Sequence, residues 1–411
     1  MTSASSHTPG IRTVAGGFLL YGALFTDRLA PLFLAERIGD HFDVEVAALG
    51  LLPFAIAIGW TIGLGAGRLA GRRLSLRQRL WVGGSITAVA GLASTLAPSF
   101  AVFLSIRLLG GVGANIASPA LIALVVRATP LHRRGAALGV LQSSTRVAGS
   151  FLGPIVLTLV VAASGWRPAI AVAAATIVLA LLPTMALLPR QIGPTGTTAM
   201  SRPPTYRPGG GRLIAIAAVT AVLTMLWLVL MSQGGVPLLE RWLELEVAAA
   251  GRLIAWFGVG ATFAAVAIPS WSDRSRSLAL AVGSLTTAVS GGVLGVAALL
   301  ELPLPLPIVA ACIGLAGIGL GGLPLAISVL PADAVEQGDV DRAVEVPIIS
   351  AELLGGALLP AVAFAVITEV GMAGLILTTS ALFLLLAVIG APLLSRTYRL
   401  NDPVRPGTAP S

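Results

Sequence analysis

Long apolar stretches dominate the chain, and short polar segments separate them. Each stretch continues for about 20 residues without alternating in polarity, which predicts membrane-spanning α-helices rather than barrel strands. We count twelve such stretches, at residues 14–34, 46–66, 78–97, 99–126, 136–163, 166–188, 212–235, 248–269, 277–300, 306–330, 346–367 and 370–394. The pattern predicts an all-α membrane protein with twelve transmembrane helices.

Composition supports the same class. Of the 411 residues, 56% are hydrophobic and only 11% are charged, and the mean hydropathy is +0.93. A soluble globular domain carries about 25% charged residues, so this chain has too few charges to cover a surface in water. Every basic residue is Arg, which excludes a phosphate-binding loop of the Walker type because that loop requires Lys.

Few residues suggest metal, redox or catalytic chemistry. The single Cys312 excludes an internal disulfide. The three histidines, His7, His41 and His132, lie in a tail and two different loops, so we expect no metal site and no cofactor. No nucleophile–base pattern points to an enzyme. The net charge of +8 comes from arginines in loops, so we do not expect nucleic acid as a partner.

The arginines predict the orientation of the chain. They gather in the loops after the second, fourth and sixth stretches, as Arg68, Arg72, Arg73, Arg77, Arg79, Arg127, Arg133, Arg134, Arg190, Arg202, Arg207 and Arg212. The loop after the first stretch is mainly acidic. Because arginines favour the cytoplasmic side, and the number of spans is even, we expect both termini to be cytoplasmic. The exclusive use of Arg suggests a GC-rich bacterial genome, and hence the plasma membrane.

The chain repeats itself across its midpoint. Residues 189–211 have no apolar run and are rich in Pro, Gly and Thr, which is typical of a flexible linker. On either side of it, identical residues recur at a constant offset of 206, in the pairs Pro31/Pro237, Arg68/Arg274, Gly111/Gly317, Gly113/Gly319, Gly149/Gly355, Pro154/Pro360, Gly165/Gly371 and Arg190/Arg396. Gly and Pro fix kinks and close contacts, so the halves should share their backbone geometry.

The repeat defines the expected domains. We expect two six-helix bundles joined by a cytoplasmic linker and flanked by cytoplasmic tails. The tails are residues 1–13 and 396–411, the bundles are 14–188 and 212–395, and the linker is 189–211.

Several motifs resemble those of the major facilitator superfamily. Gly63–Arg73 (GLGAGRLAGRR) resembles the family's loop between helices 2 and 3, although Gly67 stands where the family has Asp. The corresponding loop of the second half keeps Asp273–Arg274. Arg107–Gly113 resembles the helix-4 motif, and Gly149–Pro154 resembles the antiporter motif without its last two glycines. The resemblance implies parallel halves that transport a substrate by alternating access.

Four ionisable residues lie near the middle of predicted spans, namely Asp27, Arg107, Arg146 and Glu352. Such a residue costs about 3 kcal/mol at a helix centre unless it has a partner or water. The resemblance implies that all four face the central cavity. We predict that Asp27 pairs with Arg107 and exchanges a proton when the pair opens. The alternative is a static pair that only fixes helix packing.

Arg146 and Glu352 occupy equivalent positions of the repeat and are expected to face each other across the halves. They then bridge the halves, or Arg146 binds an anion while Glu352, as a proton-coupling residue, takes a proton. The alternative is that one of them points into its bundle and pairs locally. We expect Arg28 to reach outward to the membrane interface. Further candidates for substrate binding are Asn115, Gln142 and Gln233.

Basic loops of the first half and an acidic loop of the second half suggest a cytoplasmic latch. Its candidate residues are Arg68, Arg72, Arg133, Asp273, Arg274, Asp339 and Asp341. Partly exposed ion pairs contribute about 0.2–1 kcal/mol each, which is enough to bias two conformations a few kcal/mol apart. The alternative is that these charges are simply solvated.

We therefore expect a secondary active transporter coupled to protons. The partial antiporter motif and the sparse polar lining favour efflux of a hydrophobic or drug-like compound by antiport. The alternative, favoured by Arg146 and Arg28, is uptake of a small organic anion with protons. A transporter-like membrane sensor without flux is the hypothesis from a different class. The expected partners are a small-molecule substrate, protons and the lipid bilayer, and the expected state is a monomer.

Overall fold

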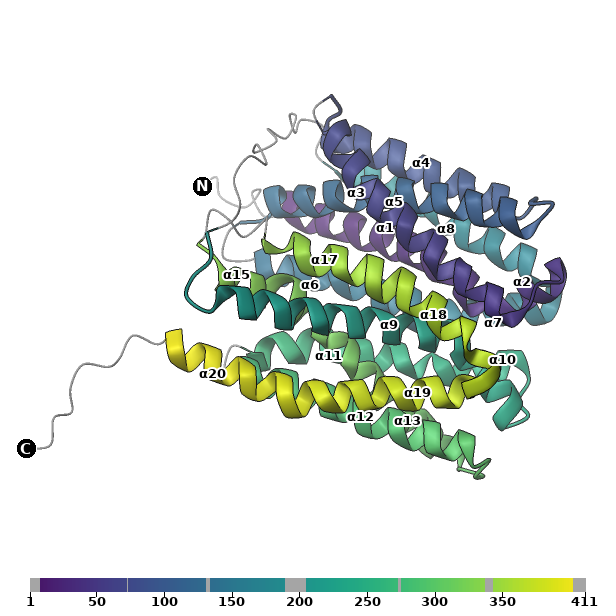
Figure 1. The fold of residues 1–411 in the computed structure, drawn as a ribbon. Coiled ribbons are helices and arrows are strands. Elements are labelled where there is room, and N and C mark those ends of the chain that lie inside the picture. The colour runs from purple at the N-terminus through teal and green to yellow at the C-terminus, as the bar shows by residue number, and fades with distance from the viewer. Residues whose placement is uncertain are drawn as a thin grey trace, which may run out of the picture.

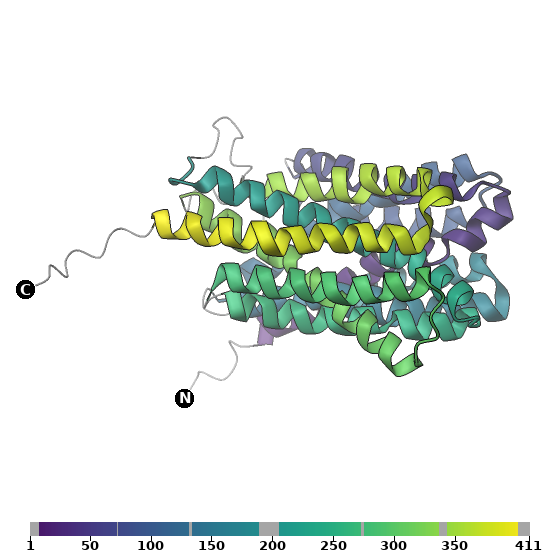
Figure 2. The same ribbon diagram turned by 60° about the horizontal axis from the view of Figure 1, so that its bottom comes forward.

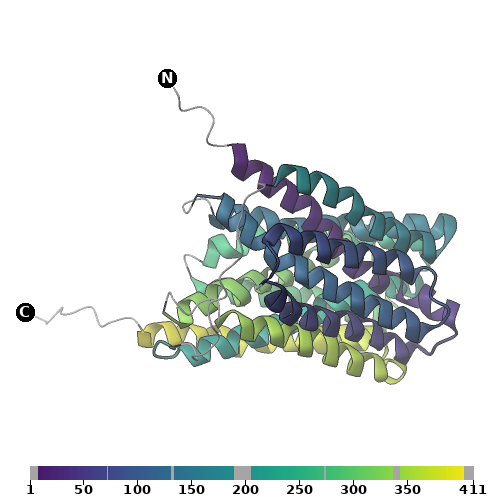
Figure 3. The same cartoon turned by 90° about the horizontal axis from the view of Figure 1, so that it is seen from above.

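The structure is a computed structural model that describes residues 8–71, 73–130, 134–188, 205–272, 275–336 and 343–401. Almost all of these residues are helical, and among them the only β-type pairing is an isolated bridge between Tyr206 and Val335. Figure 1, Figure 2 and Figure 3 show the helices running side by side along one long axis of the molecule. The prediction of an all-α fold is confirmed.

The helices before the linker are α1 (Thr8–Phe33), α2 (Ala35–Phe42), η1 (Val46–Gly50), α3 (Leu51–Ala70), α4 (Leu76–Ser94), α5 (Phe100–Ala128), α6 (Arg134–Ser144), η3 (Thr145–Leu152), α7 (Gly153–Ser164) and α8 (Trp166–Leu187). Together α6, η3 and α7 cross the molecule as one nearly continuous run. We call α1 to α8 the first half.

The second half begins with α9 (Gly210–Trp242), α10 (Val247–Ile254), α11 (Trp256–Ser272) and α12 (Arg276–Leu299). Its tenth span consists of α13 (Leu306–Gly317), η4 (Ile318–Gly321), α14 (Gly322–Pro324), η5 (Leu325–Val329) and α15 (Leu330–Ala334). The last two spans consist of α17 (Glu345–Ser350), η7 (Ala351–Leu358), α18 (Leu359–Ala365), α19 (Ile367–Leu385), η8 (Leu386–Gly390) and α20 (Ala391–Asn401).

Twelve spans follow from these elements. Within the described residues, ten helical runs are long and apolar enough to cross a membrane, and the pair α1–α2, bent by 54°, forms an eleventh. We assign α4 as the twelfth: it is a helix of 19 residues that is not among these apolar runs, and its first turn carries Arg77 and Arg79. These two arginines lower the mean hydropathy of α4, while the rest of the helix packs along α5 and α8.

The two halves have the same internal packing. In the first half α1 packs on η3 and α3 on α5, and in the second half α9 packs on η7 and α11 on α13. The segments η3 and η7 are both π-helical and lie 206 residues apart. Gly165 and Gly371, separated by the same offset, both have positive φ angles, 87° and 70°, which glycine adopts without strain. The predicted internal repeat is therefore visible in the backbone.

The halves meet along two symmetric seams. At one seam α3 of the first half packs on η7, and at the other α11 packs on η3. Close backbone contact at the second seam depends on Gly258, where a Cβ atom would lie only 2.3 Å from the backbone nitrogen of Phe151. Figure 1 shows α15 and α20 at one end of the molecule and α2 and α10 at the other. We call these the α20 end and the α2 end.

Candidate functional site

Asp27 and Arg107 form an ion pair inside the first half. Arg107 donates from Nη1 to Oδ1 of Asp27 at 3.1 Å and from Nη2 to Oδ2 at 2.9 Å, and it also donates to the Asp27 backbone carbonyl. Both side chains are only 2% exposed. The structure thus contains the pair that the sequence predicts.

The surroundings of this pair differ from the expectation. A Cβ atom on Gly91 of α4 would lie 2.8 Å from Oδ1 of Asp27 and 2.7 Å from the Cβ of Ala174 on α8. The carboxylate therefore lies between α1, α4, α5 and α8, which all belong to the first half. The expectation that Asp27 and Arg107 face a cavity between the halves is wrong, because this face of α1 packs into its own bundle.

Arg28 and Glu352 connect the two halves. Arg28 on α1 donates from Nη1 to Oε1 of Glu352 at 3.0 Å and from Nη2 to Oε2 at 2.6 Å. This bidentate geometry is the strongest that an arginine and a carboxylate form. The guanidinium also stacks over Trp60 of α3, with 4.1 Å between its Cζ and the ring centroid, and lies 5.6 Å from the Phe25 ring centroid.

Two expectations are therefore corrected. Arg28 does not reach outward to the membrane interface, since it is only 6% exposed and pairs with Glu352. Glu352 does not pair with its repeat counterpart Arg146. The reason is that η7 packs against α3 while η3 packs against α11, so equivalent positions of the repeat meet different helices.

Arg146 is a buried cation that forms no ion pair among the described residues. Its Nη1 donates to the carbonyl of Gln142 at 3.1 Å and to Oγ1 of Thr145 at 3.2 Å, and its Nη2 donates to the carbonyl of Leu320 at 3.3 Å. Its Nε has no hydrogen-bond partner, even though the residue is buried, with only 6% of it exposed. Leu320 belongs to the second half, so Arg146 also lies where the halves meet.

Tyr21 interacts electrostatically with these charges. It lies on α1, is 8% exposed, interacts with the Gln142 side chain, and is within electrostatic reach of Arg28, Arg146 and Glu352. The structure thus gathers Tyr21, Arg28, Arg146 and Glu352 into one central cluster, and it places the Gln142 side chain beside it. An aromatic hydroxyl, two guanidinium groups and one carboxylate can bind an anion and exchange a proton.

The other polar candidates lie apart from the central cluster. Asn115 donates from Nδ2 to the carbonyl of Trp60 at 2.6 Å, so it links α5 to α3. Gln233 donates from Nε2 to the carbonyl of Leu49 at 2.8 Å and lines a cavity of about 360 Å³ near the α2 end. Both side chains are buried, and both join backbones of neighbouring helices.

Ion pairs between the halves occur at both ends of the molecule. At the α2 end, Arg37 donates to Glu240 at 2.7 Å and Arg241 donates to Glu36, so two Glu-Arg dipeptides pair crosswise. At the α20 end, Arg68 pairs with Glu345. The remaining latch candidates, Arg72, Arg133, Asp273, Arg274, Asp339 and Asp341, lie outside the described residues.

Sequence reasoning missed Tyr21, and although Trp60 was a candidate for lining a cavity, its contact with Arg28 was not predicted. Trp60 carries the Arg28 guanidinium on its ring face, and Tyr21 lies two helical turns before Arg28 on α1. A signal existed for Tyr21, because residues seven apart on a helix share a face. Among the described residues, no three His, Cys, Asp or Glu side chains gather in a way that would hold a metal ion.

The comparisons with known proteins agree with this architecture. The model of the Major Facilitator Superfamily matches residues 13–240. A hexuronate transporter from Bacillus subtilis is 30% identical over 143 residues, which are 35% of this chain and 34% of that protein. A probable sulfoacetate transporter from Cupriavidus necator is 28% identical over 151 residues, 37% of this chain and 35% of that protein. The chain thus spans about a third of the length of these curated relatives.

Solved structures show the same fold at low sequence identity. A POT family transporter in complex with 5-aminolevulinic acid has a TM-score of 0.77 and 12% identity, and the match covers 96% of this chain and 98% of that one. A D-xylose-proton symporter has a TM-score of 0.73 and 16% identity, with 94% and 98% covered. From the matched family model, the chain belongs to the major facilitator superfamily, and its fold is that of a multi-pass membrane protein.

Proposed function

We propose that this transporter moves a small organic anion together with protons. The observation that carries the proposal is Arg146, a buried guanidinium with no carboxylate partner among the described residues. A buried charge is costly unless it is compensated, and a substrate carboxylate would supply the missing negative charge. The curated relatives named for hexuronate and sulfoacetate have anionic substrates by name, which supports the same substrate class.

In this proposal Glu352 is the proton-coupling residue. While it is ionised, it holds Arg28 and thereby ties α1 of the first half to η7 of the second. When an anion approaches Arg28 and Arg146, Arg28 exchanges one carboxylate for another and Glu352 takes up a proton. The bridge between the halves is then broken, and the halves are free to tilt about the central cluster.

The Asp27–Arg107 pair, which the sequence suggests for proton coupling, fits a positioning role better. Both residues belong to the first half, so tilting of one half against the other does not separate them. Arg107 additionally binds the backbone carbonyl of Asp27, which fixes α1 next to Arg28. Its function would be to hold Arg28 in place for Glu352.

Alternating access requires gates at both ends. The crosswise pairs of Glu36 with Arg241 and Arg37 with Glu240 would hold the α2 end closed, and Arg68 with Glu345 would contribute at the α20 end. All of these side chains are partly exposed, so each pair contributes only about 0.2–1 kcal/mol. Such weak pairs shift the equilibrium between the open and closed states of each end without fixing it in one state.

Proteoliposome uptake tests the proposal. Radiolabelled hexuronates, sulfoacetate and other small carboxylates are offered with an imposed proton gradient. We expect accumulation of at least one of them by the wild-type protein, loss of binding in Arg146→Ala, and exchange without accumulation in Glu352→Gln. Retained binding and accumulation in Arg146→Ala would overturn the assignment of Arg146.

Export of a hydrophobic compound by antiport is the competing hypothesis, and the Gly149–Pro154 motif in η3 and α7 favours it. The direction of proton movement separates the two. Addition of substrate to the outside acidifies the vesicle interior in symport and alkalinises it in antiport. Absence of flux for every compound that stabilises the protein would favour the sensor hypothesis.

A further inference from the structure

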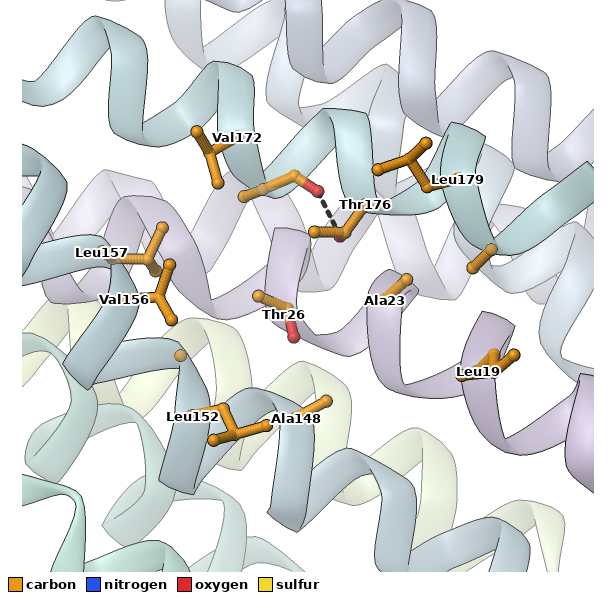
Figure 4. A pocket seen from close by; sticks show the side chains of 13 residues that line it. Leu19, Ala23, Thr26, Ala148, Leu152, Val156, Leu157, Val172, Thr176 and Leu179 are labelled. Carbon is orange, nitrogen blue, oxygen red and sulfur yellow. Dashed lines mark hydrogen bonds between the residues drawn. The ribbon is translucent and has the colours of Figure 1, made fainter.

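A groove runs along the outer face of the first half, between α1, the segment η3–α7, and α8. Its volume is about 370 Å³, a size typical of ligand pockets (about 300–1,000 Å³). Figure 4 shows side chains from all three helical segments pointing into it. The lining contains no charged residue, and its only two hydroxyl groups belong to Thr26 and Thr176.

Neither hydroxyl has its proton free to donate to a ligand. Thr26 donates to the carbonyl of Gly22 at 3.0 Å, and Thr176 donates to the carbonyl of Ala173 at 2.6 Å. Threonine commonly bonds within its own helix in this way. The groove therefore presents mainly methyl and methylene groups, which favours an apolar occupant.

The groove opens sideways, toward the bilayer. Its rim residues are apolar and exposed, with Leu179 71%, Leu19 49% and Val156 43% exposed. Each lies within a membrane-spanning helix, so the medium in front of the rim is hydrocarbon. The depth comes from small residues on the floor, namely Ala23, Ala148, Gly153, Ala173 and Ala180.

The extent of the groove fits part of a hydrocarbon chain. On α1 the lining runs from Leu19 to Thr26, and on α8 it runs from Val172 to Ala180. At about 1.5 Å per residue, these segments are roughly 10–12 Å long and lie in the middle portions of their helices. Apart from the Thr26 hydroxyl, the described lining has no polar group at either end that could bind a headgroup.

From these observations we propose that the groove is a binding site for the acyl chain of a bilayer lipid. The lipid's headgroup stays in the interface while the distal part of one chain fills the space between α1, η3–α7 and α8. This assignment is independent of the transported substrate.

An acyl chain in this position touches the helical turns that carry the central charges. Thr26, Asp27 and Arg28 are consecutive on α1, and they face the groove, the interior of the first half and Glu352, respectively. On η3, Ala148 lines the groove while Arg146, two residues earlier, reaches the second half. The lipid chain therefore supports, from outside, the two segments that hold the cluster.

Photocross-linking in proteoliposomes tests the site. A phosphatidylcholine with a diazirine in the middle of one acyl chain is incorporated, irradiated, and mapped by pepsin digestion and mass spectrometry. We expect the labelling of segments Leu152–Leu157 and Val172–Leu179 to be at least threefold higher than that of the lipid-facing residues Val289 and Val293 on α12, which are 58% and 43% exposed.

Two matched variants distinguish the groove from the general lipid surface. Thr176→Trp fills the groove and should reduce the labelling at least threefold. Val178→Trp lies two residues away on α8, is 41% exposed and does not line the groove, so it should leave the labelling unchanged. A thermal unfolding curve for each variant confirms that both are folded.

Two results would overturn the proposal. One is labelling of the groove equal to that of α12 and insensitive to Thr176→Trp. The other is efficient labelling of the groove by a free adamantyl diazirine without labelling by the lipid probe, which would assign the site to a small apolar solute instead.

Discussion

Asp27 and Arg28 are neighbours in the sequence, yet their side chains form ion pairs in two different parts of the molecule. Successive residues of a helix point about 100° apart, so Asp27 reaches Arg107 within the first half while Arg28 reaches Glu352 in the second. One turn of α1 thus carries one ion pair within the first half and one ion pair between the halves. Most of our predictions concern the difference between these two ion pairs.

Glu352→Gln should uncouple transport from the proton gradient. The amide cannot release or take up a proton, and it holds Arg28 less strongly than a carboxylate does. We expect gradient-driven accumulation to fall at least tenfold while substrate exchange continues. The control is Glu369→Gln, which changes a carboxylate in the first turn of α19, away from the cluster. Accumulation at the wild-type level in Glu352→Gln would exclude Glu352 as the coupling residue.

The charge swap Arg28→Glu with Glu352→Arg tests the bridge itself. Each single change leaves two like charges buried side by side, and breaking a buried pair costs about 3–5 kcal/mol. We expect both single variants to lose thermal stability and the double variant to recover part of it. The measurement is the unfolding temperature in detergent. Equal losses that simply add in the double variant would show that the two residues do not interact.

Asp27→Ala should destabilise the protein more than it affects coupling. It leaves the Arg107 guanidinium buried without a counter-ion, for which we expect a loss of about 3–5 kcal/mol. The control is Asp40→Ala on α2, where the side chain is exposed. The isosteric Asp27→Asn keeps a hydrogen-bond acceptor, and we expect it to retain gradient-driven accumulation. Selective loss of accumulation in folded Asp27→Asn would instead assign proton exchange to Asp27.

Gly258→Ala should open the seam between α11 and η3. The added Cβ would lie 2.3 Å from the backbone nitrogen of Phe151, and overpacking of this kind costs about 1–3 kcal/mol. We expect reduced transport and faster labelling by thiol reagents of a cysteine introduced at this seam in a Cys312→Ser background. Gly292→Ala on α12 is the matched control, because no atom lies within 4 Å of its Cβ position. Identical behaviour of the two variants would argue against close contact at this seam.

Arg37→Glu should loosen the α2 end by placing a second carboxylate beside Glu240. A pair this exposed contributes about 0.2–1 kcal/mol and is weakened by salt. We expect faster labelling of a cysteine introduced at Leu49, in a Cys312→Ser background, at low ionic strength. Addition of Glu240→Arg should restore the slow rate. If the cysteine is labelled at the same rate in the wild-type protein, the single variant and the double variant, these dipeptides do not contribute to a gate.

The sequence was sufficient to predict the fold and much of the charge pattern. Twelve apolar stretches and a constant offset of 206 residues predict the spans and the repeat, because helix length is fixed by the bilayer thickness. The Asp27–Arg107 pair could be predicted from depth alone. Both residues lie near the same level of the membrane and belong to the same half.

The partners of Arg28 and Glu352 could not be predicted in this way. The depth of a residue along a helix does not tell in which direction its side chain points around the helix axis. Asp27 and Arg28 lie at nearly the same depth and differ mainly in this direction. The repeat was also misleading for Arg146 and Glu352. A twofold axis relates equivalent positions without bringing them together. Here Arg146 lies on η3, which packs on α11, and Glu352 lies on η7, which packs on α3.

Both η3 and η7 are wound as π-helix over eight residues, at matching positions in the two halves. A π-helical turn contains one more residue than the α-helical ladder around it needs. One additional residue in a helix turns the side chains that follow it by about 100° relative to an uninterrupted α-helix. Arg146 and Glu352 each lie within such a segment, so the directions of these two charges depend on where the π-helical hydrogen bonds begin and end.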